Sequence, residues 1–297
     1  MTNKPDLLLG FADTFENCER FFTDILSRRY NVIRDDERPH YAIIGDPNFG
    51  ETHHKWDSSI VAKILYTGEN YRPTYFNYDY AIGFDFINSP YHYRLPLYTL
   101  EMWAIVNDNK LTHDMDFLNK IHTEIDWEKA FDEASPGFTY IQSNPNCIPR
   151  NNMVENLMRN FEVLCGGPHF NNIGYVIPRD RKLKIDFLKK KRMNIAFENG
   201  SHPGYVTEKI LDAFTAGVMP FYWGSNQIGR DFNRDCFIDA TVDPFGGSVG
   251  RCRTVMNDKR LWCNMMAQPR FPMGIPTAYA NIENFLDWFD MCVYMGY

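Results

Sequence analysis

The side chains in this sequence that are best suited to binding a sugar phosphate are concentrated in one short loop. Glu198 and Asn199 directly follow an apolar run, and Glu208 precedes Lys209. If a helix begins after Thr207, the N–H groups of its first turn can bind an anion, and Lys209 adds a full positive charge. Carboxylate and amide groups suit sugar hydroxyls. These residues therefore indicate a nucleotide-sugar site; the alternative is an ordinary helix start with solvated Glu208 and Lys209.

The segments around this loop are typical of a strand, a helix and a second strand. Residues 193–197 form an apolar run of strand length, and residues 219–223 form another. Between them, Ile210 and Phe214 lie at helical spacing, and Gly217 is placed to end the helix. Such a βαβ unit presents its loops at the carboxyl ends of parallel strands, where ligands bind. We therefore expect the loop to lie at the ligand-binding edge of a parallel sheet.

Several motifs resemble those of the glycosyltransferase family 10 fucosyltransferases, which use GDP-fucose and form α-1,3 or α-1,4 linkages. The central motif is FEN followed by YVTEK and YWGS, within residues 197–225. Further motifs are SNPN at residues 143–146, PRN at 149–151, GY at 174–175, YTGEN at 66–70 and DYAIGFD at 79–85. They occur in the order of the family and resemble most closely its short bacterial members.

The resemblance implies a role for individual residues. Residues 62–66 are expected to form a strand that delivers Glu69, which occupies the family position of the base that deprotonates the acceptor hydroxyl. Arg150 and Lys209 would stabilise the leaving diphosphate. The implied donor-binding residues are Arg150, Glu198, Asn199, Tyr205, Val206, Thr207, Glu208 and Lys209. The alternative for Glu69 is a carboxylate that only accepts hydrogen bonds within its own turn.

The resemblance also implies the fold, an α/β fold of the GT-B-like type with two Rossmann-like domains facing an interdomain cleft. Small, chain-breaking residues at 134–137 favour a domain boundary there. We expect an acceptor-side domain at residues 1–135 and a GDP-sugar donor-binding domain at residues 136–275. Residues 276–297 contain an amphipathic helix, which is a candidate to pack back on the first domain.

The predicted reaction is an inverting transfer of L-fucose from GDP-fucose to a hydroxyl of an oligosaccharide or glycoconjugate acceptor. The expected linkage is α-1,3 to GlcNAc or glucose. Because side chains stabilise the leaving group, no cofactor is expected to be required, and a divalent metal would at most stimulate the reaction. Two alternatives stay open: the same fold with another GDP-sugar, or a catalytically silent glycan-binding protein. The aromatic segment at residues 91–94 could form an acceptor surface or pack in the core.

The composition excludes some classes of partner. A net charge of −7 over 297 residues argues against a nucleic-acid-binding protein. The basic run at residues 179–192 is interrupted by Ile185, Phe187 and Leu188, which favours a solvated helix face over a nucleic-acid site. The seven cysteines include no CxxC pair, so reduced thiols are expected. No apolar run is long enough to cross a membrane, and we expect a cytoplasmic, soluble protein.

Two short patterns could suggest a metal site. His53 and His54 are adjacent, and adjacent side chains in a strand point to opposite faces, so one ion would not readily bind both. Asp114 and Asp116 form a DxD triplet, the motif with which another glycosyltransferase class holds a metal. The triplet precedes an expected helix, however, and acidic residues are common at helix starts. We interpret both patterns as structural and expect no metal site.

Overall fold

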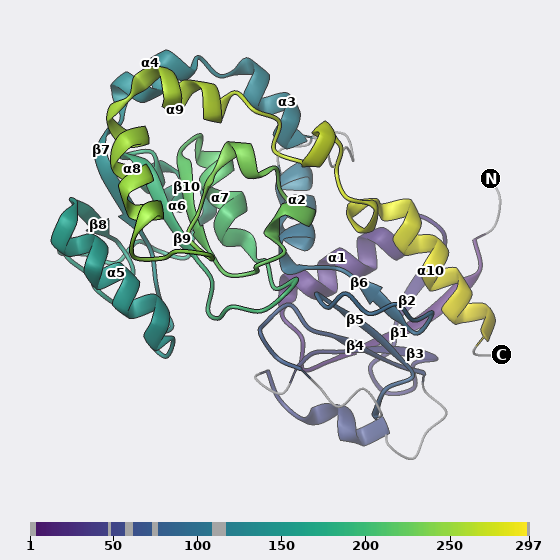
Figure 1. The fold of residues 1–297 in the computed structure, drawn as a ribbon. Coiled ribbons are helices and arrows are strands. Elements are labelled where there is room, and N and C mark those ends of the chain that lie inside the picture. The colour runs from purple at the N-terminus through teal and green to yellow at the C-terminus, as the bar shows by residue number, and fades with distance from the viewer. Residues whose placement is uncertain (1–3, 47–48, 57–61, 73–76, 109–116, 296–297) are drawn as a thin grey trace. The chain divides into compact units, whose positions relative to one another are not determined.

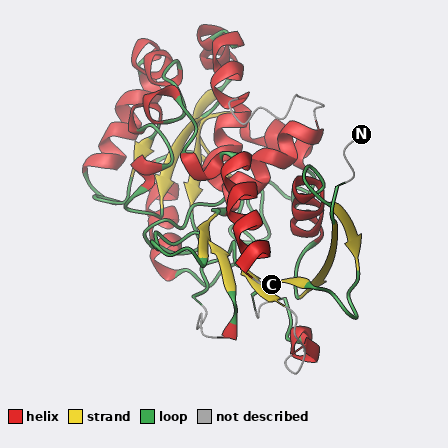
Figure 2. Ribbon diagram, turned by 90° about the vertical axis from the view of Figure 1, so that its right-hand side faces the viewer, coloured by secondary structure: helices red, strands yellow, loops and turns green. Residues whose placement is uncertain are grey.

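A computed structural model describes residues 4–46, 49–56, 62–72, 77–108 and 117–295, which form two α/β units (Figure 1). The first unit comprises Met1–Met115 together with Ala278–Tyr297, and the second comprises Asp116–Thr277. In each unit a central sheet is flanked by helices (Figure 2). Within the described residues, no helix is both long enough and apolar enough to span a membrane.

The first unit contains a six-stranded sheet whose strand pairs are all parallel. The strands are β1 (Asp6–Ala12), β2 (Asn31–Arg34), β3 (Tyr41–Ile44), β4 (Ala62–Tyr66), β5 (Tyr80–Gly83) and β6 (His92–Arg94). Their order across the sheet is β2-β1-β3-β4-β5-β6. The chain therefore adds strands on one side of β1 and then on the other, so the order reverses between β1 and β3.

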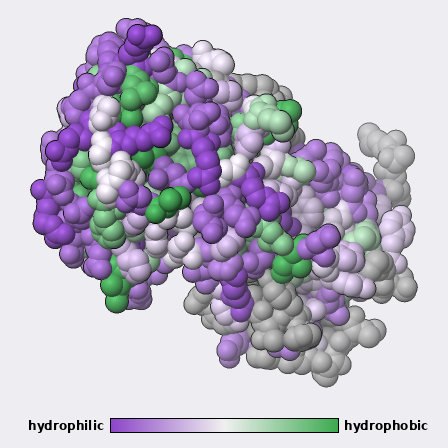
Figure 3. All heavy atoms as spheres, in the orientation of Figure 1, coloured by the Kyte–Doolittle hydropathy of each residue, from purple (hydrophilic) through white to green (hydrophobic). Residues whose placement is uncertain are grey.

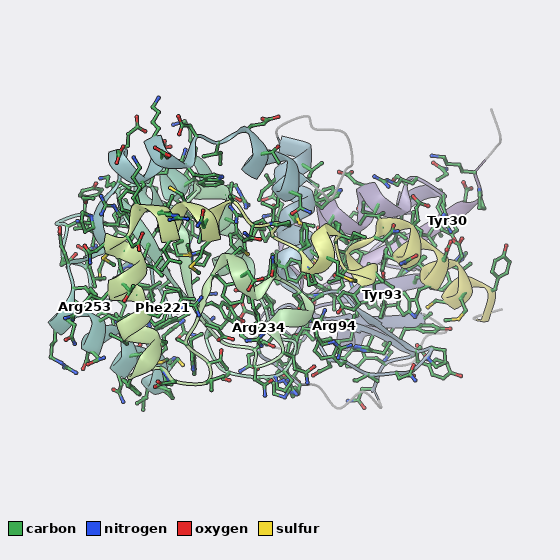
Figure 4. All side chains as sticks on the ribbon, turned by 45° about the horizontal axis from the view of Figure 1, so that its top comes forward. Tyr30, Tyr93, Arg94, Phe221, Arg234 and Arg253 are labelled. Atoms are coloured by element: carbon green, nitrogen blue, oxygen red, sulfur yellow. The ribbon has the colours of Figure 1, made fainter. Side chains whose placement is uncertain are left out.

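Helices α1 (Glu16–Leu26), α2 (Leu97–Asp108) and α10 (Ile282–Met295) belong to this unit, and α1 contacts both of the others. The ring of Phe285 in α10 lies 6.4 Å from that of Phe21 and 5.8 Å from that of Phe22. Tyr93 of β6 lies 5.3 Å from Phe285, and Figure 4 shows Tyr93 beside the C-terminal segment. The last helix is thus part of the core of the first unit.

A cluster of ion pairs also joins α10 to the turn that follows α1. Arg29 contacts Glu283 at 2.9 Å, Asp287 at 2.8 Å and Asp290 at 2.6 Å. Tyr30 donates a hydrogen bond of 2.5 Å to Asp290. The acidic side chains of the terminal helix therefore have basic and hydroxyl partners within the same unit.

The second unit contains a five-stranded sheet whose strand pairs are also parallel. The strands are β7 (Ser135–Tyr140), β8 (Val163–Cys165), β9 (Lys191–Phe197), β10 (Met219–Trp223) and β11 (Ile238–Asp239). Their order is β11-β10-β9-β7-β8, so the direction of strand addition reverses between β7 and β9.

The second unit contains the helices α3 (Phe117–Glu124), α4 (Trp127–Glu133), α5 (Ile148–Asn160), α6 (Arg181–Leu188), α7 (Glu208–Ala216), α8 (Gly247–Asn257) and α9 (Lys259–Met266). All of them except α3 contribute to apolar clusters with the sheet or beside it. One apolar cluster joins the sheet to α4, α5, α8 and α9, and another contains residues of α6 and α7. In the view of Figure 3 the second unit presents mostly hydrophilic side chains, because the apolar sides of its helices face the sheet.

The second unit begins at Asp116, and not at residue 136 as the sequence predicted. Helices α3 and α4 belong to the second unit, where the ring of Phe131 lies 5.6 Å from that of Trp262 in α9. The small residues that suggested a linker instead form the start of β7. The register of β7 against β9 shifts between Ser135 and Phe138, and Gly137 has a φ of 123°. A bulged strand start uses the same residue types as a linker, which explains the difference.

The basic run at residues 179–192 lies on α6 and the start of β9, and several of its members form ion pairs. Arg181 lies 3.3 Å from Asp212, and Lys184 also contacts Asp212. Lys182 pairs with Asp186 at 2.6 Å. This agrees with the interpretation of the run as a helix face.

Replacing Phe285 with alanine tests whether α10 is integral to the first unit. We expect a loss of about 3–5 kcal/mol in unfolding free energy, because a buried aromatic side chain is removed. Tyr294, at 82% exposure on the same helix, provides the control, and Tyr294→Ala should change stability by less than about 0.5 kcal/mol. Chemical denaturation followed by circular dichroism measures both. Equal effects of the two substitutions would contradict a core role for α10.

Candidate active site

The loops that follow β7 and β9 meet at the point where the strand order of the second sheet reverses. Ligands of open α/β sheets bind outside the carboxyl ends of the strands at such points. Arg150 lies in the first turn of α5, after β7, and Asn199 follows β9. Nη1 of Arg150 donates a hydrogen bond of 2.5 Å to Oδ1 of Asn199. Two residues predicted from separate motifs are thus brought together across the reversal.

A network of hydrogen bonds orders the SNPN loop beside Arg150. The carbonyl oxygen of Asn144 accepts bonds from Nη2 of Arg150 at 2.5 Å and from Nε2 of Gln142 at 2.6 Å. Asn151 donates a bond of 2.7 Å to the carbonyl oxygen of Pro145. Arg150 is only 2% exposed, so the network fixes a buried guanidinium at the sheet edge. Gln142 belongs to none of the motifs named above. Only its position just after a strand could have marked it as a site residue.

A buried carboxylate fixes the start of α7. Glu198 is 0% exposed, and its two oxygens accept hydrogen bonds from the backbone N–H of Thr207 at 2.8 Å and from its hydroxyl at 2.6 Å. Nζ of Lys209 donates to the Thr207 hydroxyl oxygen at 2.9 Å and lies 3.4 Å from Oε2 of Glu198. Thr207 occupies the N-cap position, but its side chain makes no capping bond because it is directed to Glu198.

The ionisable groups around Lys209 perturb one another. Burial raises the pKa of Glu198, and the charge of Lys209 partly offsets this effect. Burial also opposes ionisation of Glu208, but the charges of Lys209 and Lys184 outweigh it and lower the pKa of Glu208 to about 2. Nζ of Lys209 lies 3.4 Å from Oε1 of Glu208, and Lys184 pairs with Asp212. Lys184 comes from α6, and no local pattern in the chain indicates its contact with this group of residues.

The loop between β9 and α7 is fixed to the end of β10. The backbone N–H of Gly204 donates a hydrogen bond of 2.9 Å to Oγ of Ser225. Tyr205 and Val206, both predicted to contact the donor, are buried, and the N–H of Tyr205 donates to the carbonyl oxygen of His202 at 3.1 Å. Their positions indicate a rigid loop that supports the neighbouring polar groups.

Glu69 lies in the first unit, in the loop after β4. Its carbonyl oxygen accepts hydrogen bonds from the Thr67 hydroxyl at 3.2 Å and from the Tyr71 N–H at 2.6 Å. Glu69 also lines a pocket of about 150 Å³. Other lining residues are Phe15, Asp46, Phe49, Tyr66 and Glu101.

This pocket is formed by the loops at the carboxyl ends of β1, β3 and β4. It therefore lies where the strand order of the first sheet reverses. The loops after β1 and β3 approach closely at Gly45, because a Cβ there would lie 1.7 Å from the carbonyl oxygen of Asp13. A glycine at this position allows the loops to form the wall of the pocket.

The other predicted candidates have different surroundings. In β6, Arg94 lies 4.1 Å from the ring centre of Phe86 and 4.4 Å from that of Tyr279, and Figure 4 shows it beside the C-terminal segment. Tyr93 packs in the core, whereas Tyr91 is 53% exposed at the amino end of the strand. Packing therefore accounts for most of this aromatic segment.

The interpretation of the His53-His54 pair and the DxD triplet as structural stays a prediction. The DxD triplet at residues 114–116 lies outside the described residues, and the side chains of His53 and His54 are not described either. Among the residues that the structure describes, no group of three or more His, Cys, Asp or Glu side chains could hold a metal ion.

Comparison with known proteins identifies related families and folds. Residues 7–101 match the model of the α-(1,3)-fucosyltransferase FucT N-terminal domain, and residues 138–246 match that of the glycosyltransferase family 10 (fucosyltransferase) C-terminal region. The α-(1,3)-fucosyltransferase FucT of Helicobacter pylori is 33% identical over 246 residues, covering 76% of this chain and 50% of the relative. The chain thus spans about half the length of that curated relative.

Solved structures show the same fold. A crystal structure of an α1,3-fucosyltransferase has a TM-score of 0.79 at 25% identity, covering 97% of this chain and 90% of the other. A crystal structure of an α1,3-fucosyltransferase with GDP-fucose has a TM-score of 0.76 at 23% identity, covering 98% and 91%. The prediction of a GT-B-like pair of Rossmann-like domains is confirmed.

The low pKa of Glu208 predicts an acid-dependent contribution to stability. Its folded-state pKa of about 2 lies below the ordinary value of 4.5, so its ionised form stabilises the fold above pH 4.5. That contribution, at most about 3 kcal/mol for such a shift, is lost as the pH falls from 4.5 toward 2.

Urea unfolding of wild type and Glu208→Gln at a series of pH values tests this. The wild type should be the more stable above pH 4.5, and the difference should shrink on acidification. A difference that is independent of pH would show that Glu208 is not held ionised by Lys184 and Lys209.

Proposed function

Because the chain belongs to glycosyltransferase family 10, we propose that it is a GDP-fucose-dependent fucosyltransferase that inverts configuration at the transferred sugar. The observation that carries the proposal is the bond from Arg150 to Asn199 at the strand reversal of the second sheet, beside the anchored Lys209. The position at which open α/β sheets bind ligands therefore carries the positive charges of Arg150 and Lys209. The named relative, an α-(1,3)-fucosyltransferase, supports the choice of transferred sugar and linkage.

Arg150 and Lys209 would act on the leaving group. As the bond between the fucose anomeric carbon and the diphosphate oxygen breaks, negative charge develops on GDP. Cations that are already fixed in place stabilise this charge without reorganisation. Glu198 and Thr207 would hold Lys209, since they engage each other and the ammonium group. Asn199 and Glu208 would bind the diphosphate and sugar hydroxyls.

Glu69 would act as the general base. The acceptor hydroxyl transfers its proton to the Glu69 carboxylate while its oxygen forms a bond to the anomeric carbon, and GDP departs from the opposite face. This displacement inverts the anomeric configuration. The pocket beside Glu69 supports the assignment, because it is lined by carboxylates and rings suited to a sugar.

The acceptor is proposed to be a glycan with a free 3-hydroxyl on GlcNAc or glucose. Because Arg150 and Lys209 supply the positive charge that metals supply elsewhere, no cofactor should be required. A divalent ion would at most increase the rate.

The donor and the role of Lys209 are tested by GDP release. Purified protein should release GDP from GDP-fucose, and not from GDP-mannose or UDP-galactose, when N-acetyllactosamine is present. Lys209→Met should lower kcat roughly 10²–10³-fold, by analogy with the loss of one preorganised donor at a developing anion.

Lys189→Met is the matched control, since Lys189 is an exposed lysine of the same unit. It should retain wild-type turnover. Near-normal kcat in Lys209→Met would remove Lys209 from the leaving-group role, and binding of glycan without any GDP-sugar turnover would favour a silent glycan-binding protein.

The base assignment is tested by Glu69→Gln. This variant should fold normally and lose about 10²–10⁴-fold in kcat, with the acidic limb of the pH–rate profile removed. Glu16→Gln, at an exposed position in the same unit, should leave the profile unchanged. If Glu69→Gln keeps the wild-type limb, another group accepts the proton.

A further inference from the structure

Two neutral oxygen atoms orient the guanidinium of Arg150. Nη1 donates to Oδ1 of Asn199 and Nη2 donates to the carbonyl oxygen of Asn144, each at 2.5 Å. Neither acceptor carries a charge, so these bonds orient the guanidinium without neutralising it. Nε of Arg150 is also buried and has no hydrogen-bond partner among the described residues. The direction of the guanidinium therefore depends on where these two oxygen atoms lie.

The side-chain amide of Gln142 holds one of them in place. Its Nε2 donates to the carbonyl oxygen of Asn144 at 2.6 Å and to Oδ1 of Asn151 at 2.8 Å. Asn151 in turn donates to the carbonyl oxygen of Pro145 at 2.7 Å. The SNPN loop is thus fixed at two consecutive carbonyl groups, and Gln142 supports one of them directly and the other through Asn151.

Tyr140 determines which end of this amide faces the loop. Its hydroxyl donates a hydrogen bond of 2.5 Å to Oε1 of Gln142, and the two residues are 2% and 3% exposed. Because the carbonyl oxygen of Asn144 can only accept, the NH₂ group of the amide must face it, and Oε1 must face Tyr140. The side chain therefore needs one acceptor and two donors, which neither a carboxylate nor an apolar side chain supplies.

The backbone of Gln142 is fixed by the loop that follows β8. Its carbonyl oxygen accepts a hydrogen bond of 3.1 Å from the N–H of His169. Gly167 allows this loop to approach, since a Cβ there would lie 2.4 Å from both N and O of Gln142. Both the backbone and the side chain of Gln142 are thus held at the edge of the sheet.

From these contacts we infer that Gln142 is a positioning residue for the transfer, which acts by holding Arg150 through the carbonyl group of Asn144. This rests on the proposed function, because it concerns the cation assigned there to the leaving diphosphate. A cation that is already in place stabilises developing negative charge without rearrangement. Arg150 has a long side chain with many rotamers, so it keeps one orientation only while its acceptors are fixed.

The need for neutral acceptors explains why an amide suits this position. A carboxylate beside Asn144 would repel the carbonyl oxygen, and it would attract the guanidinium away from the diphosphate. The glutamine amide avoids both effects, because it donates to the loop and adds no charge.

The test measures steady-state GDP release from GDP-fucose with N-acetyllactosamine as acceptor. Gln142→Met keeps a similar side-chain length and removes the amide. We expect kcat/KM for GDP-fucose to fall roughly 3- to 10-fold, the scale of one lost hydrogen bond. KM for the acceptor should not change, because the contacts of Gln142 lie in the second unit. Gln268→Met, at an exposed glutamine of the same unit, is the matched control and should behave as the wild type.

The same substitution in an Arg150→Met background separates positioning from general damage to the site. With no guanidinium left to position, Gln142→Met should lower kcat/KM by no more than about twofold further. A glutamine that only stabilises the fold would instead lower kcat/KM by the same factor in both backgrounds.

Two further variants keep the test valid if Gln142→Met fails to fold, as judged by circular dichroism. Gln142→Glu retains the acceptor for Tyr140 and should lose at least as much activity as Gln142→Met, because it cannot donate to the loop. Tyr140→Phe leaves the amide but removes the bond that orients it, and should lower kcat/KM by a smaller factor.

Wild-type kcat/KM in Gln142→Met, or equal losses in the two backgrounds, would overturn the inference and leave the proposed reaction standing. No GDP release by the wild type from any GDP-sugar would overturn the proposed reaction, and the inference with it.

Discussion

The buried carboxylate of Glu198 is the constraint on which the proposed donor site depends. It receives both donors of Thr207, and through Thr207 it fixes the ammonium group of Lys209. Space for it exists because Gly224 has no side chain, since a Cβ there would lie 2.5 Å from Cγ of Glu198. Ionising a buried carboxylate is unfavourable unless a charge compensates it, so Glu198 and Lys209 require each other.

The positions of the other proposed site residues follow from the topology of the two parallel sheets. In each unit the strand order reverses once along the sheet, and in each the residues proposed to act follow strands beside that reversal. In the second unit these are Arg150 and Asn199, and in the first they line the pocket with Glu69. One unit would thus supply fixed cations for a leaving diphosphate, and the other would supply the Glu69 carboxylate for a sugar hydroxyl. The side chains proposed to act at the two strand reversals differ in sign of charge, although both reversals occur in parallel sheets.

Sequence patterns predicted secondary structure correctly where a segment's structure depends mainly on its own residues. The expected strand, helix and strand around residues 193–223 correspond to β9, α7 and β10, and Gly217 ends α7 with a φ of 69°. Features that depend on distant partners were missed or misread. Thr207 was expected to cap its own helix, but Glu198 takes its hydroxyl. Lys184 contacts Asp212 of another helix, Gln142 bonds to Asn144 within an irregular loop, and the bulged start of β7 resembled a linker.

Arg150 is proposed to bind a nucleotide diphosphate at the strand reversal of the second sheet. Calorimetric titration of GDP and of guanosine into wild type and Arg150→Met tests it most directly. We expect the wild type to bind GDP far more tightly than guanosine. The ratio of the two dissociation constants should shrink at least tenfold in the variant, which corresponds to about 1.4 kcal/mol. An unchanged ratio would show that the diphosphate is held elsewhere and not by Arg150.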